Sequence, residues 1–201
     1  MEQLLNTASE LETRRTVLKK YKIGDGKKLY EIIERNRDRI LDSFPLMLSN
    51  IYDELSAEYF IRKKIEEWEE RSAFNFGIWL KENQQCIGYI SIKNIDWVIP
   101  RGEVAYVISE EYERRGIMTE ALTSIIKFGF ESLSINRLYL RILTSNNRSY
   151  ELAERCGFSR EGILRKDQKT YEGELVNLYY YGITREDYKK FFSWEALSCK
   201  S

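Results

Sequence analysis

The sequence predicts an α/β protein, with one mixed sheet of seven strands and helices on its faces. Residues 103–109 read as a strand and residues 117–133 carry apolar side chains at helical spacing, so the hydrophobic period changes from two to 3.6. Residues 74–81 and 86–95 alternate on either side of Asn83-Gln84-Gln85, as the arms of an antiparallel hairpin do. Strand-like and helix-like segments interleave without repeats or linkers, which indicates a single domain.

The composition limits the classes of partner. The chain has 201 residues, of which 43% are hydrophobic, and its 32 basic and 32 acidic side chains give a net charge of zero. Without a block of like charge there is no electrostatic case for binding nucleic acid or an anionic membrane. No apolar run approaches ~18 residues and the N-terminus lacks a signal-peptide pattern, so we expect a cytoplasmic protein.

Residues that commonly bind metals or act as nucleophiles are scarce. Cys86, Cys156 and Cys199 are widely spaced and form no Cys-x-x-Cys pair, which argues against a zinc site and against a disulfide framework. The chain has no histidine, the commonest metal ligand and general base. We therefore expect no metal, and no nucleophile of the Ser-His or Cys-His kind.

The N-terminal part is expected to contain a polar leader (residues 1–12), an edge strand (residues 13–21) and a helix that Asp25 can cap. The apolar side of this helix would carry Leu29, Ile32, Ile33 and Ile40. Its charged residues are interpreted as solvated surface: Glu31, Glu34, Arg35, Arg37, Asp38 and Arg39. Phe44-Pro45 would end it, and a second helix is predicted over residues 56–72.

The C-terminal part is expected to continue the sheet. After the strand and helix of residues 103–133 we predict a buried strand over residues 137–143, then a helix that begins in the polar stretch 144–149 and is closed by a left-handed Gly157. Residues 158–166 and 174–183 are predicted as a last strand pair.

A terminal helix follows the last strand. Thr184-x-x-Asp187 resembles a capping box with Asp in place of Glu and opens this helix, which we expect to end near Phe192. The domain would then span residues 13–192, followed by a tail over residues 193–201.

The turn between the 103–109 strand and the following helix suits a phosphate. A helix N-terminus presents unpaired N–H groups and partial positive charge, so it is a natural anion site. Gly116 lets the backbone approach a ligand closely, and Arg114 and Arg115 add charge. By itself such a turn is more often only a connection between two elements.

Two longer motifs resemble a known family. Glu103-Val-Ala-Tyr-Val-Ile-Ser-Glu-Glu-Tyr-Glu-Arg-Arg-Gly116-Ile-Met-Thr-Glu-Ala-Leu122 is similar to the signature of the GNAT superfamily of acyl-CoA-dependent N-acyltransferases. Asn146-Asn-Arg-Ser149, followed by Gly157-Phe-Ser-Arg-Glu-Gly162, resembles its second motif, in the form of the RimJ/RimL type that acetylates ribosomal-protein N-termini. The likeness of motif order extends from about residue 13 to about residue 188. It implies a mostly antiparallel seven-stranded sheet.

The resemblance also implies acetyl-CoA as the cofactor. Its pantetheine arm would lie along Val107 and Ile108. Its pyrophosphate would meet the backbone N–H groups of the turn, namely those of Arg114, Arg115, Gly116, Ile117, Met118 and Thr119. Asn146 and Ser149 would lie beside the pantetheine and the thioester.

Four positions depart from the family pattern. Glu113 stands where Gln or Arg is usual, and Met118 where Gly or Ala is usual. Ala153 replaces the tyrosine that serves many members as acid for the leaving thiol, and Asn177 replaces a frequent aspartate of the last strand. The cofactor site is therefore better supported than the chemistry.

Glu103 is the leading candidate for a general base, acting through a water, because it begins the central strand and shares a face with Ala105 and Val107. A solvated strand-end carboxylate is an equally good interpretation. Asn146 and Ser149 complete the candidate catalytic set, although Ser149 also suits capping or cofactor contact. Cys156 suits helix packing better than a leaving-group role. Asp96, Glu103, Tyr106 and Asn177 are the candidate substrate contacts, with loop or core roles as the plainer interpretations for Asp96 and Tyr106.

The acceptor is expected to be a protein N-terminus. An α-amino group of pKa ~7.7 to 8.0 is roughly 10–15% neutral at pH 7, whereas a lysine of pKa ~10.4 is neutral roughly once in 2,500. A site without an obvious strong base therefore suits the α-amine. The alternatives are a small-molecule amine, such as a polyamine or an antibiotic, and a non-catalytic acyl-CoA-binding module. The aromatic strand Tyr179-Tyr180-Tyr181 leaves both a monomer and a homodimer open.

Overall fold

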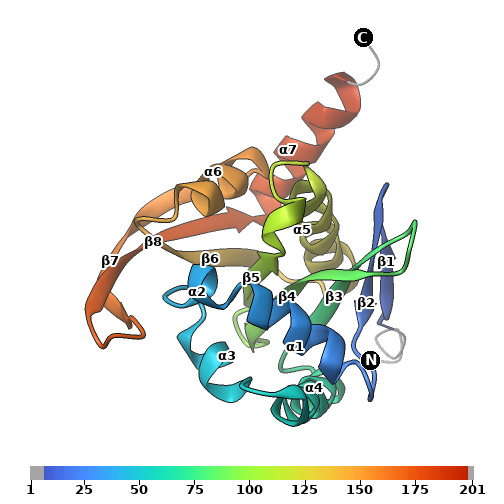
Figure 1. The fold of residues 1–201 in the computed structure, drawn as a ribbon. Coiled ribbons are helices and arrows are strands. Elements are labelled where there is room, and N and C mark those ends of the chain that lie inside the picture. The colour runs from blue at the N-terminus through green and yellow to red at the C-terminus, as the bar shows by residue number, and fades with distance from the viewer. Residues whose placement is uncertain (1–6, 199–201) are drawn as a thin grey trace.

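The protein folds around one sheet, seen in a computed structural model that describes residues 7–198, with side chains to residue 193. The sheet has eight strands in the order β1-β2-β3-β4-β5-β6-β8-β7 (Figure 1). Its strands are β1 Glu10–Glu12, β2 Thr16–Lys20, β3 Phe74–Leu80, β4 Cys86–Asp96, β5 Arg101–Ile108, β6 Arg137–Leu143, β7 Ser159–Lys169 and β8 Leu175–Thr184. Every pairing is antiparallel except β5 with β6, which confirms the predicted mixed, mostly antiparallel sheet.

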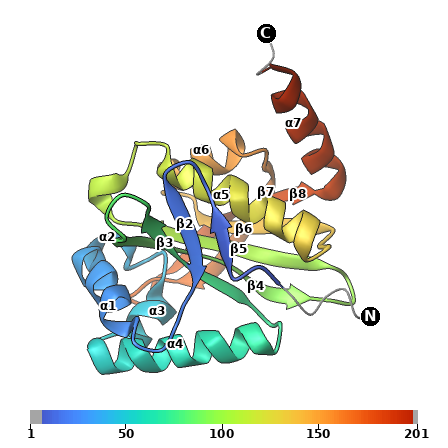
Figure 2. The same ribbon diagram turned by 90° about the vertical axis from the view of Figure 1, so that its right-hand side faces the viewer.

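Helices pack on both faces of the sheet (Figure 2). They are α1 Gly26–Arg35, α2 Arg37–Ile40, α3 Pro45–Asn50, α4 Glu54–Glu69, α5 Ile117–Lys127, α6 Asn147–Arg155 and α7 Arg185–Ser198, with a 3₁₀ turn η2 Glu110–Tyr112 and a π-helical turn η3 Phe128–Ser132. Leu29, Ile33, Ile61, Tyr89 and Val107 belong to a core cluster between α1–α4 and the sheet, and a larger cluster contains α5 and α6. No helix within residues 7–198 combines the length and apolar character needed to cross a lipid bilayer.

The N-terminus adds a strand that the sequence did not predict. β1 lies within the expected polar leader and pairs with β2, so β2 is an interior strand and not the edge strand we expected. Three residues of which two are glutamates give too weak an alternation to be recognised. Pairing with the ready edge of β2 supplies the backbone hydrogen bonds that the short segment needs.

The first helix is capped by a distant residue. The Asp25 side chain makes no cap bond, which corrects our expectation, and instead accepts from the Lys22 N–H (3.0 Å) and the Lys28 ammonium (3.1 Å). The Glu58 carboxylate, from α4, accepts from the N–H groups of Gly24 (2.8 Å) and Gly26 (3.0 Å). A carboxylate stabilises a helix N-terminus whichever part of the chain supplies it. The residues around Gly26 do not indicate that Glu58 would take this role, because Glu58 lies on another helix.

The predicted first helix is broken in two at a buried asparagine. Asn36, only 3% exposed, separates α1 from α2 and donates its amide to the Ile32 carbonyl (2.7 Å). Beyond the break, Pro45 occupies the first turn of α3, a short helix in the stretch where we expected none. The helix predicted over residues 56–72 is α4, which begins with a capping box between Asp53 and Ser56.

The predicted strands and turns of the C-terminal half are confirmed. The 74–81 and 86–95 hairpin is β3 and β4, and the central unit is β5 and α5. The Thr184 N–H donates to the Asp187 carboxylate (3.0 Å) and the Asp187 N–H to the Thr184 hydroxyl (3.2 Å), which is the predicted capping box. α7 then runs to Ser198, into the segment we expected to be a tail, while Cys199 lies outside the described residues.

The tyrosines of β8 are used within the chain. Tyr181 is wholly buried, and its hydroxyl donates to Glu154. The Tyr179 ring packs edge-on against Tyr150, and Tyr180 stacks on Tyr139. These contacts account for the aromatic strand, and a homodimer through it stays a prediction.

Gly157 is expected to be sensitive to substitution for two reasons. It closes α6 at φ +90°, where a side chain is strained, and an added Cβ would lie 3.0 Å from the Phe191 ring of α7. Gly157→Ala should cost about 1–2 kcal/mol of unfolding free energy from the backbone alone, and more from the ring contact. Thermal unfolding would measure this, with Gly24→Ala as the control, because Gly24 has φ +96° but open space around it. Equal losses in the two variants would show that Phe191 contributes nothing.

Candidate functional site

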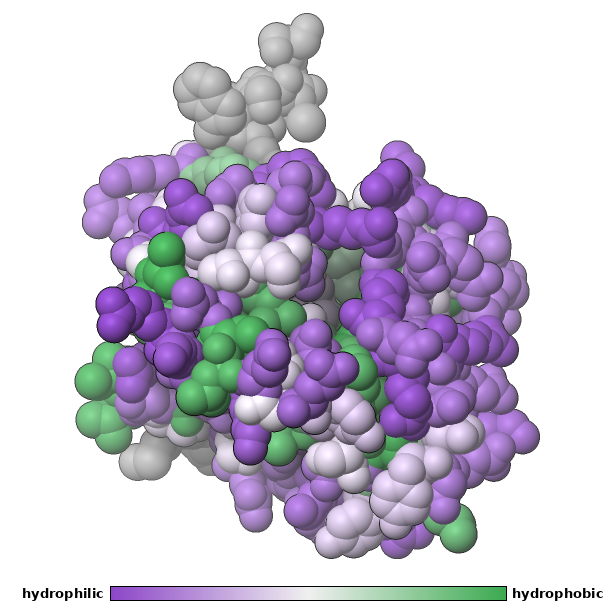
Figure 3. All heavy atoms as spheres, turned by 60° about the vertical axis from the view of Figure 1, so that its left-hand side comes forward, coloured by the Kyte–Doolittle hydropathy of each residue, from purple (hydrophilic) through white to green (hydrophobic). Residues whose placement is uncertain are grey.

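A cleft opens where β5 and β6 separate. The two strands pair only at residues 101–103 of β5, so the edge of β5 from Val104 to Ile108 is not paired with β6. The cleft has a volume of about 1030 Å³ and is lined by residues of α2, β5, β6, α6 and the turn before α5. Figure 3 shows a hollow in the face it presents, with apolar atoms inside and hydrophilic side chains on its rims.

The turn at the N-terminus of α5 forms one end of the cleft. Gly116 adopts φ +73°, and the first helical bond there joins the Glu120 N–H to the Gly116 carbonyl (3.2 Å). The N–H groups of the three residues between them, Ile117, Met118 and Thr119, precede that bond, and all three residues line the cleft. These N–H groups can bind an anion, as the sequence predicted.

The two arginines of the turn face different ways. Arg114 lines the cleft and has φ 57°, a conformation that non-glycine residues seldom adopt. Arg115 lines a second, smaller cleft together with Arg14, Arg15 and Lys81, and lies over the Tyr112 ring at 5.6 Å. Adjacent residues of a tight turn point apart, so the structure does not bring Arg115 to the main cleft with Arg114.

Glu103 lies on the cleft wall at the point where the strands part. It is 4% exposed, and its carboxylate accepts from the Asn94 amide (2.8 Å). Lys93 on β4 and Arg141 on β6 pair with the same Oε1 atom at 3.5 and 3.4 Å. Glu103 is therefore a buried, ion-paired carboxylate and not the solvated strand end that sequence reasoning left open.

Asn146, Ser149 and Tyr106 meet where the start of α6 contacts β5. The Asn146 side chain caps α6 by accepting the Ser149 N–H (3.1 Å), so Asn146 and not Ser149 is the cap. The Ser149 hydroxyl lies 3.0 Å from the Tyr106 hydroxyl, which also lies 3.1 Å from the Ser149 carbonyl. Burial raises the pKa of Tyr106 above its ordinary value, so this phenol stays protonated. The structure thus places a neutral hydroxyl pair in the cleft.

Two predicted substrate contacts have structural partners elsewhere. Asp96 accepts the N–H groups of Val98 (2.9 Å) and Ile99 (3.0 Å) and holds the turn between β4 and β5. Asn177 accepts the Lys166 N–H (2.9 Å), where β7 is irregular against β8. Neither residue lines the cleft, and both serve as turn or strand partners.

An ion cluster that sequence reasoning missed crosses the cleft beside the turn. Glu113 pairs with Arg39 of α2 and with Arg148 of α6, the latter at 2.5 Å. All three residues line the cleft. We interpreted Arg39 as solvated surface, and no local pattern pairs it with Glu113, which is 74 residues away. The only signal was the unusual Glu113 in the first motif.

The other end of the cleft is bordered by two chain segments that contact each other. Gln168 of β7 donates its amide to the Asp42 carbonyl, which lies between α2 and α3. The Tyr171 N–H donates to the Asp42 carboxylate at 3.4 Å. Gln168, Asp42 and Phe44 line the cleft here, so the hairpin tip and the α2–α3 segment border its far end.

The donor groups of the cleft fit the predicted cofactor. A nucleotide-linked thioester carries a pyrophosphate, which needs N–H donors and cations, and an amide-containing arm, which needs strand-like partners. The α5 N-terminus supplies the first, and the open edge of β5 supplies the second. Val107 and Ile108, 5% and 7% exposed, line that edge, and a pantetheine arm along them stays a prediction.

Comparisons with known proteins agree with this geometry. A family model described as an acetyltransferase (GNAT) domain matches residues 15–159. The chain is 31% identical over 168 residues to the putative ribosomal N-acetyltransferase YdaF of Bacillus subtilis, covering 82% of this chain and 88% of that protein. It is 30% identical to the uncharacterized N-acetyltransferase p20 of Bacillus licheniformis, where the match covers 59% of this chain and 66% of p20.

The fold is shared with solved acetyltransferases. The structure of RimL, a ribosomal L7/L12 α-N-protein acetyltransferase solved in complex with coenzyme A, matches with a TM-score of 0.80 at 15% identity. The match covers 87% of this chain and 97% of that one. At this identity the likeness concerns the fold.

Proposed function

Because this chain belongs to the GNAT acetyltransferase family, we propose that it acetylates the N-terminal α-amine of a protein, of the ribosomal-protein kind. The chain is an acetyl-CoA-dependent N-acetyltransferase, and acetyl-CoA supplies the acetyl group as an activated thioester. The observation that carries the proposal is the cleft at the separation of β5 and β6, with anion-binding N–H groups at one end and Glu103 on its wall.

We assign cofactor binding to one side of the cleft. The N–H groups of Gly116, Ile117, Met118 and Thr119 would bind the pyrophosphate, with Arg114 beside them. The open edge of β5 at Val107 and Ile108 would pair with the pantetheine arm. The Asn146 amide group would donate to that arm from α6 while its oxygen caps the helix.

Glu103 and Ser149 are the proposed proton-transfer groups. Glu103 would accept the proton of the acceptor amine through a water, and Lys93 and Arg141 hold its carboxylate in place. Ser149 would give a proton to the leaving sulfur, with Tyr106 as its hydrogen-bond partner. Ser149 and Tyr106 would together supply the proton for the leaving thiol, the role of the family tyrosine at the position of Ala153.

The acceptor is proposed from chemistry and from shape. No histidine is present to deprotonate a strongly basic amine, so a less basic α-amine is the better match. The cleft continues past Glu103 to Phe44, Asp42 and Gln168, which gives an extended chain end room beyond its terminal amine. A ribosomal acceptor would place the reaction in the cytoplasm.

A panel of acceptors tests the proposal. We expect a peptide with a free α-amine to react with kcat/KM roughly 100-fold or more above the same peptide blocked at its N-terminus but carrying a lysine, because the neutral fractions at pH 7 differ by that order. Spermidine and an aminoglycoside complete the panel. Thiol release from acetyl-CoA would be followed, and mass spectrometry would locate the acetyl group. Preference for lysine, spermidine or the aminoglycoside would refute the assignment.

A further inference from the structure

Glu113 places a carboxylate within the turn that receives phosphates. Its side chain is only 16% exposed, and both of its carboxylate oxygens are engaged. Arg39 donates to Oε1, and the Arg148 Nη1 lies 2.5 Å from Oε2. Figure 1 shows that α2 and α6, which carry the two arginines, lie on opposite sides of the β6 and β8 strands, so the cluster joins the two walls.

Arg39 is held in place by contacts other than the one with Glu113. The guanidinium of Arg39 also donates to the Asn36 side-chain oxygen (2.8 Å) and to the carbonyl of Ile108, the last residue of β5. Asn36 accepts the Glu110 N–H as well (3.1 Å), so α2 and the phosphate turn are tied together. Arg39 therefore stays beside the end of β5 whether or not Glu113 holds it.

The charges of this cluster do not balance. One carboxylate faces two guanidinium groups, which leaves one net positive charge beside the α5 N-terminus. Arginine binds phosphate as well as carboxylate, with the same fork of N–H donors. A pyrophosphate bound at residues 116–119 would thus compete with Glu113 for both arginines and would be repelled by the carboxylate itself.

We propose that Arg39 and Arg148 are phosphate-binding residues for the cofactor pyrophosphate, and that Glu113 is an internal counter-ion that competes for them. The inference rests on the proposed position of the cofactor at the α5 turn. Glu113 would then lower the affinity of the protein for the cofactor below the affinity that a neutral residue at this position would give.

Replacing the counter-ion tests the proposal. Glu113→Gln keeps the shape of the side chain and removes its charge, so it should lower the Kd for coenzyme A by about three- to tenfold, in line with the strength of partly exposed ion pairs. Arg148→Gln should raise Kd by a similar factor. In the double variant the gain from Glu113→Gln should shrink, because the two residues act on each other. Isothermal titration calorimetry with coenzyme A alone gives these values without turnover.

Ligands that lack parts of coenzyme A show which part of the cofactor is responsible for the change in affinity in Glu113→Gln. Dephospho-coenzyme A keeps the pyrophosphate, so the gain from Glu113→Gln should persist with it. Pantetheine has no phosphate, and its affinity should not change. Loss of the gain with dephospho-coenzyme A would overturn the assignment to the pyrophosphate, and an equal gain with pantetheine would overturn any role for phosphate.

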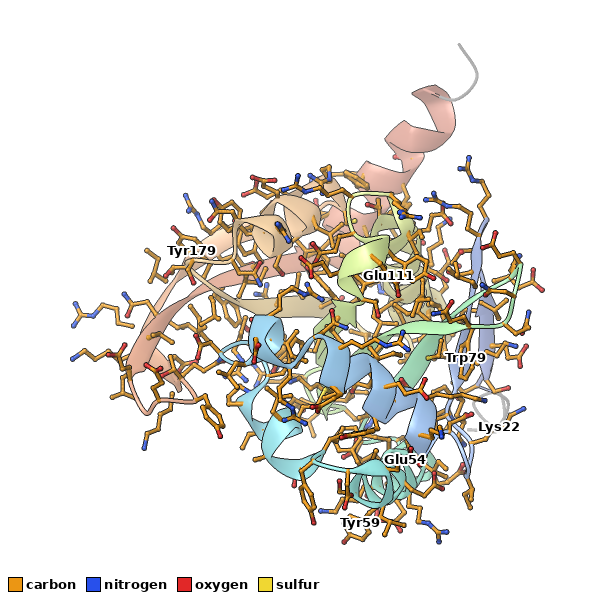
Figure 4. The ribbon with its side chains drawn as sticks, viewed as in Figure 1. Lys22, Glu54, Tyr59, Trp79, Glu111 and Tyr179 are labelled. Atoms are coloured by element: carbon orange, nitrogen blue, oxygen red, sulfur yellow. The ribbon has the colours of Figure 1, made fainter. Side chains whose placement is uncertain are left out.

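Glu111→Gln is the matched control. Glu111 lies on η2 in the same turn (Figure 4), is half exposed and pairs only loosely with Arg35, at 4.0 Å. The Kd of the Glu111→Gln variant for coenzyme A should differ from that of the unaltered protein by less than twofold. An unchanged or higher Kd in Glu113→Gln, with the melting temperature retained, would refute the competition. If the unaltered protein failed to bind coenzyme A, the proposed function itself would fail instead.

Discussion

Glu103→Gln is expected to lower kcat by about 10²-fold or more. A general base contributes typically 10²- to 10⁴-fold, and the amide cannot take the amine proton. The variant keeps the size of the side chain and can still accept from Asn94, so the wall of the cleft should stay in place. Steady-state rates with a saturating α-amine peptide measure the effect, and coenzyme A titration checks that the cofactor still binds.

Asp167→Asn is the control that distinguishes the loss of a general base from the loss of an ion pair with Arg141. Asp167 pairs with the same Arg141 at 3.3 Å, but it does not line the cleft. Its variant should keep kcat within about twofold, since exposed pairs contribute little. An unchanged rate in Glu103→Gln would remove that carboxylate from the mechanism. Equal losses in both variants would assign the effect to the placement of Arg141.

Ser149→Ala is expected to lower kcat by about 10²-fold, because the leaving sulfur then lacks its proton donor. The bond from Ser149 to Asn146 uses the backbone N–H, so alanine keeps the cap of α6 and the fold. Tyr106→Phe should lower kcat by a smaller factor, roughly tenfold, since it removes one hydrogen bond to the donor. Rates at saturating acetyl-CoA and peptide would measure both losses.

The pH profile gives a second measurement of this pair. Burial raises the pKa of Tyr106 above its ordinary value, so its phenol remains neutral below pH ~10. The kcat/KM should therefore rise with the deprotonation of the acceptor amine, near pH ~8, and then level off without a falling limb below pH ~10. A falling limb that disappears in Tyr106→Phe would contradict the neutral pair, and full activity in Ser149→Ala would exclude the hydroxyl as donor.

The predicted elements that proved correct had strong local signals. The change of period from β5 to α5, the 83–85 turn between β3 and β4, and Gly157 after α6 each depend on residues close in sequence. β1 was missed because its alternation is too short, and the break at Asn36 because a polar residue in a charged helix looks like surface until tertiary packing buries it.

The candidate site was predicted less evenly. Glu103, Tyr106, Gly116, Asn146 and Ser149, which the motifs indicated, all line the cleft, but Glu113 and Arg148 of the same motifs were not recognised as site residues. Asn177 was chosen by its position in the family pattern and Asp96 from the loop before the central strand, and both side chains accept hydrogen bonds within a turn or a strand pair. Arg39 could not be found from sequence, because its partner Glu113 lies on another element.

The sequence by itself determined the order of the longer strands and helices, the left-handed glycine that closes α6 and the family to which the motifs belong, because hydrophobic period and backbone preference act over a few residues. Only the tertiary structure decided which charges meet. Glu103 lies between Lys93 and Arg141 because β5 is flanked by β4 and β6, and Glu113 lies between Arg39 and Arg148 because α2 and α6 border one cleft. Charge pairing depends on distance in space, which the order of residues along the chain does not specify.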